Sequence, residues 1–149
     1  MKNLILILFL FFLNSCGYTS VYKNQKSQDF QINIIEMTGD KEINNLIKND
    51  LKFYSNRNSN IKYNISINSN YQKVIVSKNS AGVATDYKLM TDTVISFNGE
   101  KNNILNFSEN INIKSNSNSY EQNNYEKNIK KNFASSISNK FIIKILNKK

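Results

Sequence analysis

The feature that most constrains this chain is its first sixteen residues, which differ sharply from the sequence that follows. A short basic start, Met1 to Asn3, precedes ten consecutive apolar residues, Leu4 to Leu13. A charged start, an apolar run of about 7–15 residues and a small residue before the cleavage point are typical of a secretory signal. A membrane-spanning helix needs about 20 apolar residues, so this run is too short for one. Residues 1–15 are therefore predicted to be a signal peptide that directs export.

Cys16 follows this run directly and is the only cysteine in the chain, so no intramolecular disulfide can form. The segment Leu13-Asn14-Ser15-Cys16-Gly17 resembles a bacterial lipobox. That resemblance implies cleavage before Cys16, a diacylglycerol on its thiol and an N-acyl chain on the new amine. Several acyl chains anchor a protein stably, because each buried methylene contributes about 0.8 kcal/mol. No Asp follows Cys16, which favours the periplasmic side of the outer membrane as the location.

The charge of the chain is strongly positive. It holds 20 Lys and Arg against 11 Asp and Glu, for a formal net charge of +9. Such a charge favours anionic partners, namely nucleic acid, phosphorylated lipid or an acidic protein surface. Export argues against nucleic acid. A role in solubility alone is the competing interpretation, because the lysines are spread along the chain.

After Cys16 the sequence divides into a polar tether, residues 16–28, and a single domain, residues 29–149. The domain is predicted from alternating apolar residues, typical of strands, and from apolar residues three or four apart, typical of helices. Strands are expected over 30–35, 61–77, 87–97 and 105–113, and helices over 43–54 and 120–146. This order predicts an α+β fold, a two-layer sandwich with two helices on a four-stranded, mostly antiparallel mixed sheet. The first two strands, which flank a helix, are expected to pair in parallel.

Four local features refine this prediction. Asp40 is expected to cap the first helix, and Ser119 with Gln122 resembles a capping box before the second. The second strand is expected to pause at Ser69-Asn70, and the fourth to bulge near Glu109. The lysines at the end of the last helix are interpreted as a solvated tail.

Most catalytic chemistry is excluded by what the sequence lacks. The chain contains no His, so neither a Ser-His-Asp triad nor a Cys/His metal site can be built. Its four Gly residues are far apart, and no phosphate-binding loop is present. A pair of carboxylates could still meet in space, as in glycoside hydrolases. The prediction is that the protein is not an enzyme and has no catalytic residue, metal site or cofactor other than its covalent lipid.

Taken together, these features resemble the LptE family of lipopolysaccharide-assembly lipoproteins. The opening Cys16-Gly17-Tyr18 is similar to that family's Cys-Gly-aromatic start, and the order of elements is the family's. Ala84 to Leu89, after a turn containing Ala81-Gly82, is similar to a family segment with Tyr and then Leu. Phe133-Ala134-Ser135-Ser136-Ile137 is similar to part of its closing helix. The resemblance covers nearly all of the chain after the signal.

The resemblance implies a plug in the lumen of an LptD-type outer-membrane β-barrel, which it helps to fold and to deliver lipopolysaccharide. A sheet with one polar face suits a polar barrel lumen. Lys78 and Lys88 flank the turn at residues 79–82 and are the candidate contacts to lipopolysaccharide phosphates. Three alternatives remain open: another accessory lipoprotein of barrel assembly, a lipoprotein that binds peptidoglycan or another periplasmic polymer, and an enzyme with paired carboxylates.

Overall fold

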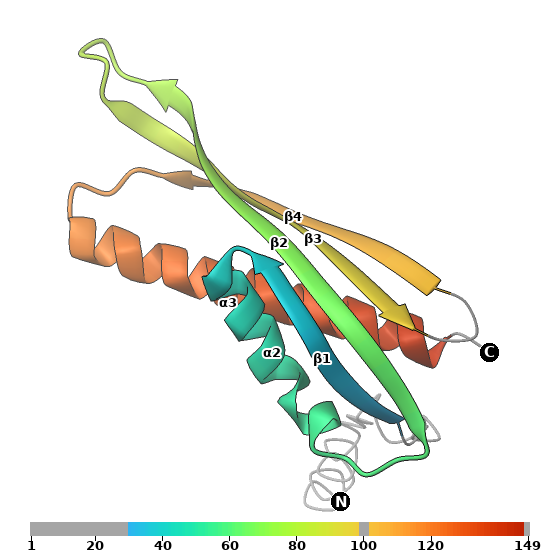
Figure 1. The fold of residues 1–149 in the computed structure, drawn as a ribbon. Coiled ribbons are helices and arrows are strands. Elements are labelled where there is room, and N and C mark those ends of the chain that lie inside the picture. Colours follow the sequence, from blue (N-terminus) through green and yellow to red (C-terminus); the bar gives the residue numbers. More distant parts are fainter. Residues whose placement is uncertain (1–29, 99–101, 148–149) are drawn as a thin grey trace, which may run out of the picture.

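The computed structural model describes residues 30–98 and 102–147, so Cys16 and the predicted signal and tether lie outside the described residues. The elements follow the predicted order, strand, helix, three strands, helix (Figure 1). They are β1 (Phe30–Gly39), α2 (Lys41–Ser55), β2 (Ile61–Lys78), β3 (Ala84–Asn98), β4 (Asn102–Lys114) and α3 (Ser119–Leu146). The α+β prediction is therefore confirmed.

The four strands form one mixed sheet in the order β1-β2-β3-β4. β1 and β2 are parallel, while β2, β3 and β4 run antiparallel to their neighbours. Parallel neighbours need a crossover connection, which α2 supplies here. Both α2 and α3 cover the same face of the sheet, and no helix of the described residues lies on its other face (Figure 1). The predicted two-layer arrangement, including the parallel first pair, is confirmed.

The core lies between that covered face and the helices. On α2 it takes Ile43, Ile47 and Leu51, and on α3 it takes the predicted four-residue repeat of apolar side chains. The buried members of that repeat are Ile129, Phe133, Ile137, Phe141 and Ile145. Phe141 is fully buried, and its ring meets the ring of Phe97 edge-on at 5.8 Å between centroids. Burial of these side chains provides most of the driving force for folding.

The caps of the helices match the prediction at one end and differ at the other. The Asp40 carboxylate accepts a hydrogen bond from the Ile43 amide at 2.8 Å, as expected of an N-cap. The cap of α3 is Asn118 instead of Ser119, since the Asn118 side chain accepts from the amides of Tyr120 and Glu121. Asn is as good a cap as Ser, and it stands one residue earlier.

The expected pause in β2 does not occur. Ser69 is fully buried, and its hydroxyl pairs with that of Thr93 on β3 at 2.9 Å. Because each hydroxyl satisfies the other, a polar pair can lie inside the sheet without a break in the ladder. The strand therefore runs without interruption from Ile61 to Lys78.

The predicted bulge near Glu109 is also wrong, because β3 and β4 pair there without a shift in register. Glu109 instead faces α3, where it accepts a hydrogen bond from Ser136 and forms an ion pair with Lys140 at 2.5 Å. Lys140 thus links α3 to the sheet and is not part of a solvated tail. The register shifts lie elsewhere, between Ile34 and Glu36 and near Ser77.

Gly39 connects β1 to α2 in a conformation that only glycine adopts easily. Its φ is +84°, and a Cβ at this position would lie 2.0 Å from the main-chain oxygen of Ser69. Gly82 has a similar φ of +79° but open space around it, so it is a matched control. We expect Gly82→Ala to lower the free energy of unfolding by about 1 kcal/mol. Gly39→Ala should lower it by about 3 kcal/mol, because overpacking adds to the strain. Equal losses in urea titrations would contradict this account.

Candidate functional site

The longest feature of the surface is the hairpin of β2 and β3, which projects beyond the rest of the domain (Figure 1). β1 ends opposite Ser69, so within residues 30–98 and 102–147 the second half of β2 has no neighbouring strand on that side. β4 ends opposite Asp86. The tip, residues 77–85, therefore extends past both edge strands.

The far part of the hairpin exposes apolar side chains. They are Val74, Ile75, Val76 and Val83, with exposed fractions of 46%, 47%, 54% and 61%. Neighbouring side chains of a strand point to opposite faces, so Val74 and Ile75 lie on opposite sides of the hairpin. Exposed apolar side chains gathered on one projecting segment indicate a candidate interaction site.

The turn that closes the hairpin is held by Asn79. Its side-chain oxygen accepts hydrogen bonds from the amides of Ala81 at 3.0 Å and Val83 at 2.9 Å. Its main chain also pairs with Val83, and its carbonyl accepts from Gly82. The tip is consequently a folded turn that presents Val83 in a fixed position.

Lys78 and Lys88, the two predicted site residues, both lie on this hairpin but at different distances from its turn. Lys78 is exposed and pairs with Ala84 next to the turn. Lys88 is partly buried and pairs with Val74. Lys88 lies four residues further along β3 than Ala84, the partner of Lys78, which corresponds to about 13 Å along a strand. Neither lysine forms an ion pair with another residue of the described part, so both amines are available to a ligand.

Lys114, which the sequence did not single out, joins this group through the register of the sheet. It pairs with Asp86 on β3, one step along the same face from Lys88. Hydrogen bonds from the Ser77 and Thr85 hydroxyls, and then the charge of Lys114, lower the pKa of Asp86. The face thus carries two cations and one fixed anion. Only the pairing register places Lys114 here, and no sequence pattern reveals it.

Two further lysines attach the hairpin to α3. Lys73 on β2 forms an ion pair with Glu126 and lies 4.2 Å from the ring centre of Tyr87. Lys130 on α3 lies 4.3 Å from the ring centre of Tyr71. These cation–π contacts and the ion pair orient the base of the hairpin. Both amines are therefore occupied, in contrast to those of Lys78 and Lys88.

Tyr71 lies beneath this attachment and has a strongly perturbed phenol. Burial first, and then the carboxylate of Glu126, raises its pKa to about 12. Because this pKa is raised on folding, the stability from the neutral phenol is complete below about pH 10 and is lost as the pH rises towards 12. We expect a tyrosinate titration of the folded protein to contain one phenol near pKa 12, which Tyr71→Phe removes. A titration unchanged by Tyr71→Phe would contradict this assignment.

The uncovered face of the sheet is densely polar. Its exposed polar side chains are Asn64, Asn68, Asn70, Gln72, Asp92, Asn106, Ser108, Asn110 and Asn112. The apolar side chains of Val94 and Ile104 are exposed among them. They stand in cross-strand rows, such as Asn70, Asp92 and Ser108, and Ser108 donates a hydrogen bond to Asp92 at 2.5 Å. This face offers a broad array of donors and acceptors.

Neither α2 nor α3 is long and apolar enough to cross a bilayer. Within residues 30–98 and 102–147, no three His, Cys, Asp or Glu side chains gather closely enough to hold a metal ion.

Comparison with known proteins gives matches to solved structures only. No protein-family model matches the chain, and no curated protein matches its sequence. Rare lipoprotein B from Shewanella oneidensis superposes with a TM-score of 0.57 at 13% identity, covering 78% of this chain and 97% of that one. The chain shares the fold of this lipoprotein. A protein from Caulobacter crescentus described as a lipoprotein gives 0.54 at 13% identity, covering 77% and 87%.

A minor lipoprotein from Acinetobacter baumannii shares the same fold, with a TM-score of 0.52 at 8% identity, covering 74% of this chain and 90% of that one. None of the three proteins is described by an enzymatic activity. At these identities the likeness establishes the fold.

Proposed function

We propose that the protein is a non-enzymatic lipoprotein, anchored through acyl chains on Cys16 to the periplasmic side of the outer membrane. Cleavage of residues 1–15 makes Cys16 the first residue, and residues 16–28 tether the domain. The protein is an accessory subunit of the lipopolysaccharide translocon and plugs an LptD-type barrel. The fold shared with three lipoproteins supports the class, and the resemblance to the LptE family supports the finer role.

The observation that carries the plug proposal is the uncovered polar face of the sheet. One face buries the core under two helices, while the other presents mainly amide and hydroxyl side chains that no described helix covers. The lumen of an outer-membrane barrel is polar, in contrast to its lipid-facing outside. A mainly polar, hydrogen-bonding face fits such a wall, although Val94 and Ile104 add two exposed apolar side chains to it.

The far part of the hairpin, residues 74–88, supports a contact with lipopolysaccharide. Its exposed valine and isoleucine side chains suit acyl chains, and the free amines of Lys78 and Lys88 suit phosphates. Lys114 strengthens the positive field beside Lys88, while Asp86 is held close to its hydroxyl donors and offsets part of it. An amphipathic, basic projection of this kind is complementary to a phosphorylated lipid.

We expect Lys78→Glu combined with Lys88→Glu to weaken lipopolysaccharide binding by about tenfold, because two attractive contacts become repulsive. The measurement is binding of the purified domain to labelled lipopolysaccharide. Lys62→Glu with Lys127→Glu changes the charge equally at two exposed positions away from the tip and should bind like the parent. Unchanged binding by the hairpin variant would remove both residues from the site.

An affinity pull-down tests the partner. The full chain carries a tag after Lys149, the outer membrane is solubilised gently, and co-purifying proteins are identified by mass. The proposal predicts a large barrel protein at one-to-one stoichiometry. An acylated, abundant protein that purifies without a barrel would refute the plug and leave only the lipoprotein class.

A further inference from the structure

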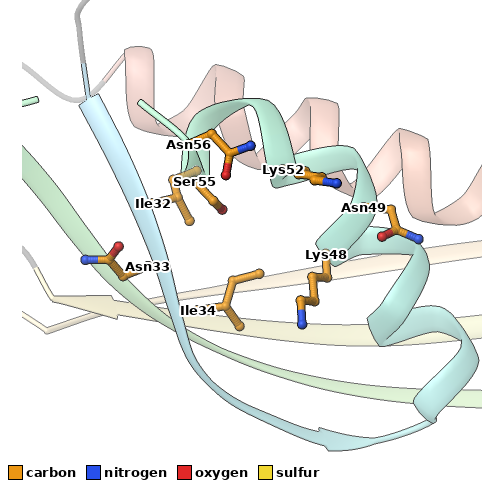
Figure 2. Close-up of a pocket in the computed structure, with 8 residues that line it drawn as sticks. All are labelled: Ile32, Asn33, Ile34, Lys48, Asn49, Lys52, Ser55 and Asn56. Carbon is orange, nitrogen blue, oxygen red and sulfur yellow. The ribbon is translucent and has the colours of Figure 1, made fainter. Parts of the chain in front are cut away.

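A groove of about 440 Å³ lies between β1 and α2, on the edge of the sheet opposite β4 (Figure 2). Its size is in the range of ligand-binding sites in proteins. The residues that shape it are Ile32, Asn33 and Ile34 on β1 and Lys48, Lys52 and Ser55 on α2. Neither the hairpin tip nor the polar sheet face contributes to it.

The first wall of the groove is the edge of β1 itself. Three consecutive residues line it, although neighbouring side chains of a strand point to opposite faces. The Asn33 side chain points away from α2 in Figure 2 and donates to the Asn64 side chain at 3.2 Å. Asn33 must therefore line the groove through its main chain. In the described part of the chain β1 pairs with β2 alone, and such an edge presents unpaired N–H and C=O groups.

The second wall is basic. Lys48 and Lys52 are exposed on α2, and neither forms an ion pair with another described residue. Lys48 and Lys52 are four residues apart, which separates them by about 6 Å along the helix axis. Two residues of an extended chain span about 6.6 Å. Carboxylates at alternate positions of an extended segment thus match the spacing of these two lysines.

We propose that this groove binds an extended acidic segment of another polypeptide. The segment adds to β1 as a fifth strand, pairs its main chain with the free edge, and directs alternate carboxylates towards Lys48 and Lys52. Strand addition of this kind draws affinity from main-chain hydrogen bonds and specificity from alternate side chains. The proposal is independent of the barrel plug and concerns a different edge of the domain.

The charge and the open edge of the groove favour an acidic extended segment over a second copy of the chain or a small anion. A second copy of the chain would place lysine pairs against each other, and each copy carries a net charge of +9. A small anion could meet the lysines but would leave the main-chain groups of β1 unpaired. An acidic extended segment satisfies both walls.

The test uses the full chain without its signal and a fluorescent peptide of alternating valine and glutamate. Fluorescence anisotropy should show this peptide binding at least about tenfold more tightly than a valine–lysine peptide. A valine–glutamate peptide with N-methylated backbone amides should also bind at least about tenfold more weakly, because it cannot complete the strand ladder. NMR should place the largest amide shifts at residues 32–34 and leave the β4 edge unchanged.

Charge reversal provides the matched variants. Lys48→Glu with Lys52→Glu should reverse the preference between the two peptides, and circular dichroism should confirm its fold. Lys127→Glu with Lys131→Glu, an exposed pair with the same spacing on α3, should retain it. Equal binding of all peptides, an unaffected Lys48/Lys52 variant, or full binding of the N-methylated peptide would overturn the proposal. Complete displacement by millimolar inorganic phosphate would assign the groove to small anions and overturn it equally.

Discussion

Replacement of Cys16 by serine is expected to release the protein from the membrane entirely. The proposed anchor consists of acyl chains on this one residue, and each buried methylene contributes about 0.8 kcal/mol to membrane affinity. Serine lacks the thiol to which diacylglycerol is attached, so no chain remains. Intact-mass measurement and membrane fractionation should show an unacylated protein in the soluble fraction.

Ser15→Ala is the matched control for this experiment, since it keeps a small residue before Cys16 and preserves the lipobox. It should remain acylated and sediment with the outer membrane. A Cys16→Ser protein that still carries acyl mass and sediments with membranes would contradict the lipoprotein assignment.

The second large effect concerns stability. Phe141→Ala is expected to lower the free energy of unfolding by about 3–5 kcal/mol, the usual cost of emptying a buried aromatic site. Phe141 is fully buried on α3 and packs edge-on against Phe97 of the sheet, so its loss leaves a cavity between the two layers. Since small domains have a total stability of about 5–15 kcal/mol, such a loss can unfold much of the population.

Phe53 on α2 is the control for size and chemistry. Its side chain is 63% exposed and lies under the Arg57 guanidinium at 4.3 Å from the ring centre. Phe53→Ala should cost about 1 kcal/mol or less, because little apolar surface is lost from the core. Similar unfolding midpoints for the two variants in urea would show that Phe141 is not a core residue.

The architecture was predictable because its signals are periodic. The four-residue repeat from Ile129 to Ile145 shows a helix and identifies its buried face before any contact is known. The same holds for the alternation around Ile65 and Ile67, which separates the core face of β2 from its open face. Asp40 could be assigned as a cap because its partner lies three residues away. Each of these depends only on neighbours in the sequence.

The errors arose where a distant partner decides the structure. Ser69 was expected to interrupt β2, but Thr93 satisfies its hydroxyl across the sheet. Glu109 was expected at a bulge, but Ser136 and Lys140 on α3 hold it in a regular strand. Asn118 displaced Ser119 as a cap because two good candidates stood side by side, and sequence alone does not rank them.

In the candidate sites, too, local features could be predicted and long-range features could not. Lys78 and Lys88 were predicted on either side of a turn, and both lie on the hairpin that the structure describes. Lys114 approaches Lys88 only through the register of β3 with β4, and the groove beside Lys48 exists only because β1 is an edge strand. Register and strand order are long-range properties, so neither site could be assembled from local patterns.

The account depends most on the claim that the open sheet face lies against the wall of a barrel, and site-specific photocrosslinking tests this directly. A photoreactive residue replaces Asn68 or Asn106, both exposed on that face, in cells that carry the full chain. The same residue at Asn128, exposed on α3, measures contacts on the helical side. The account predicts efficient crosslinks from Asn68 and Asn106 to one large outer-membrane barrel protein, and weaker ones from Asn128. Absence of a barrel crosslink from the sheet face, with the protein acylated and in the outer membrane, would contradict it.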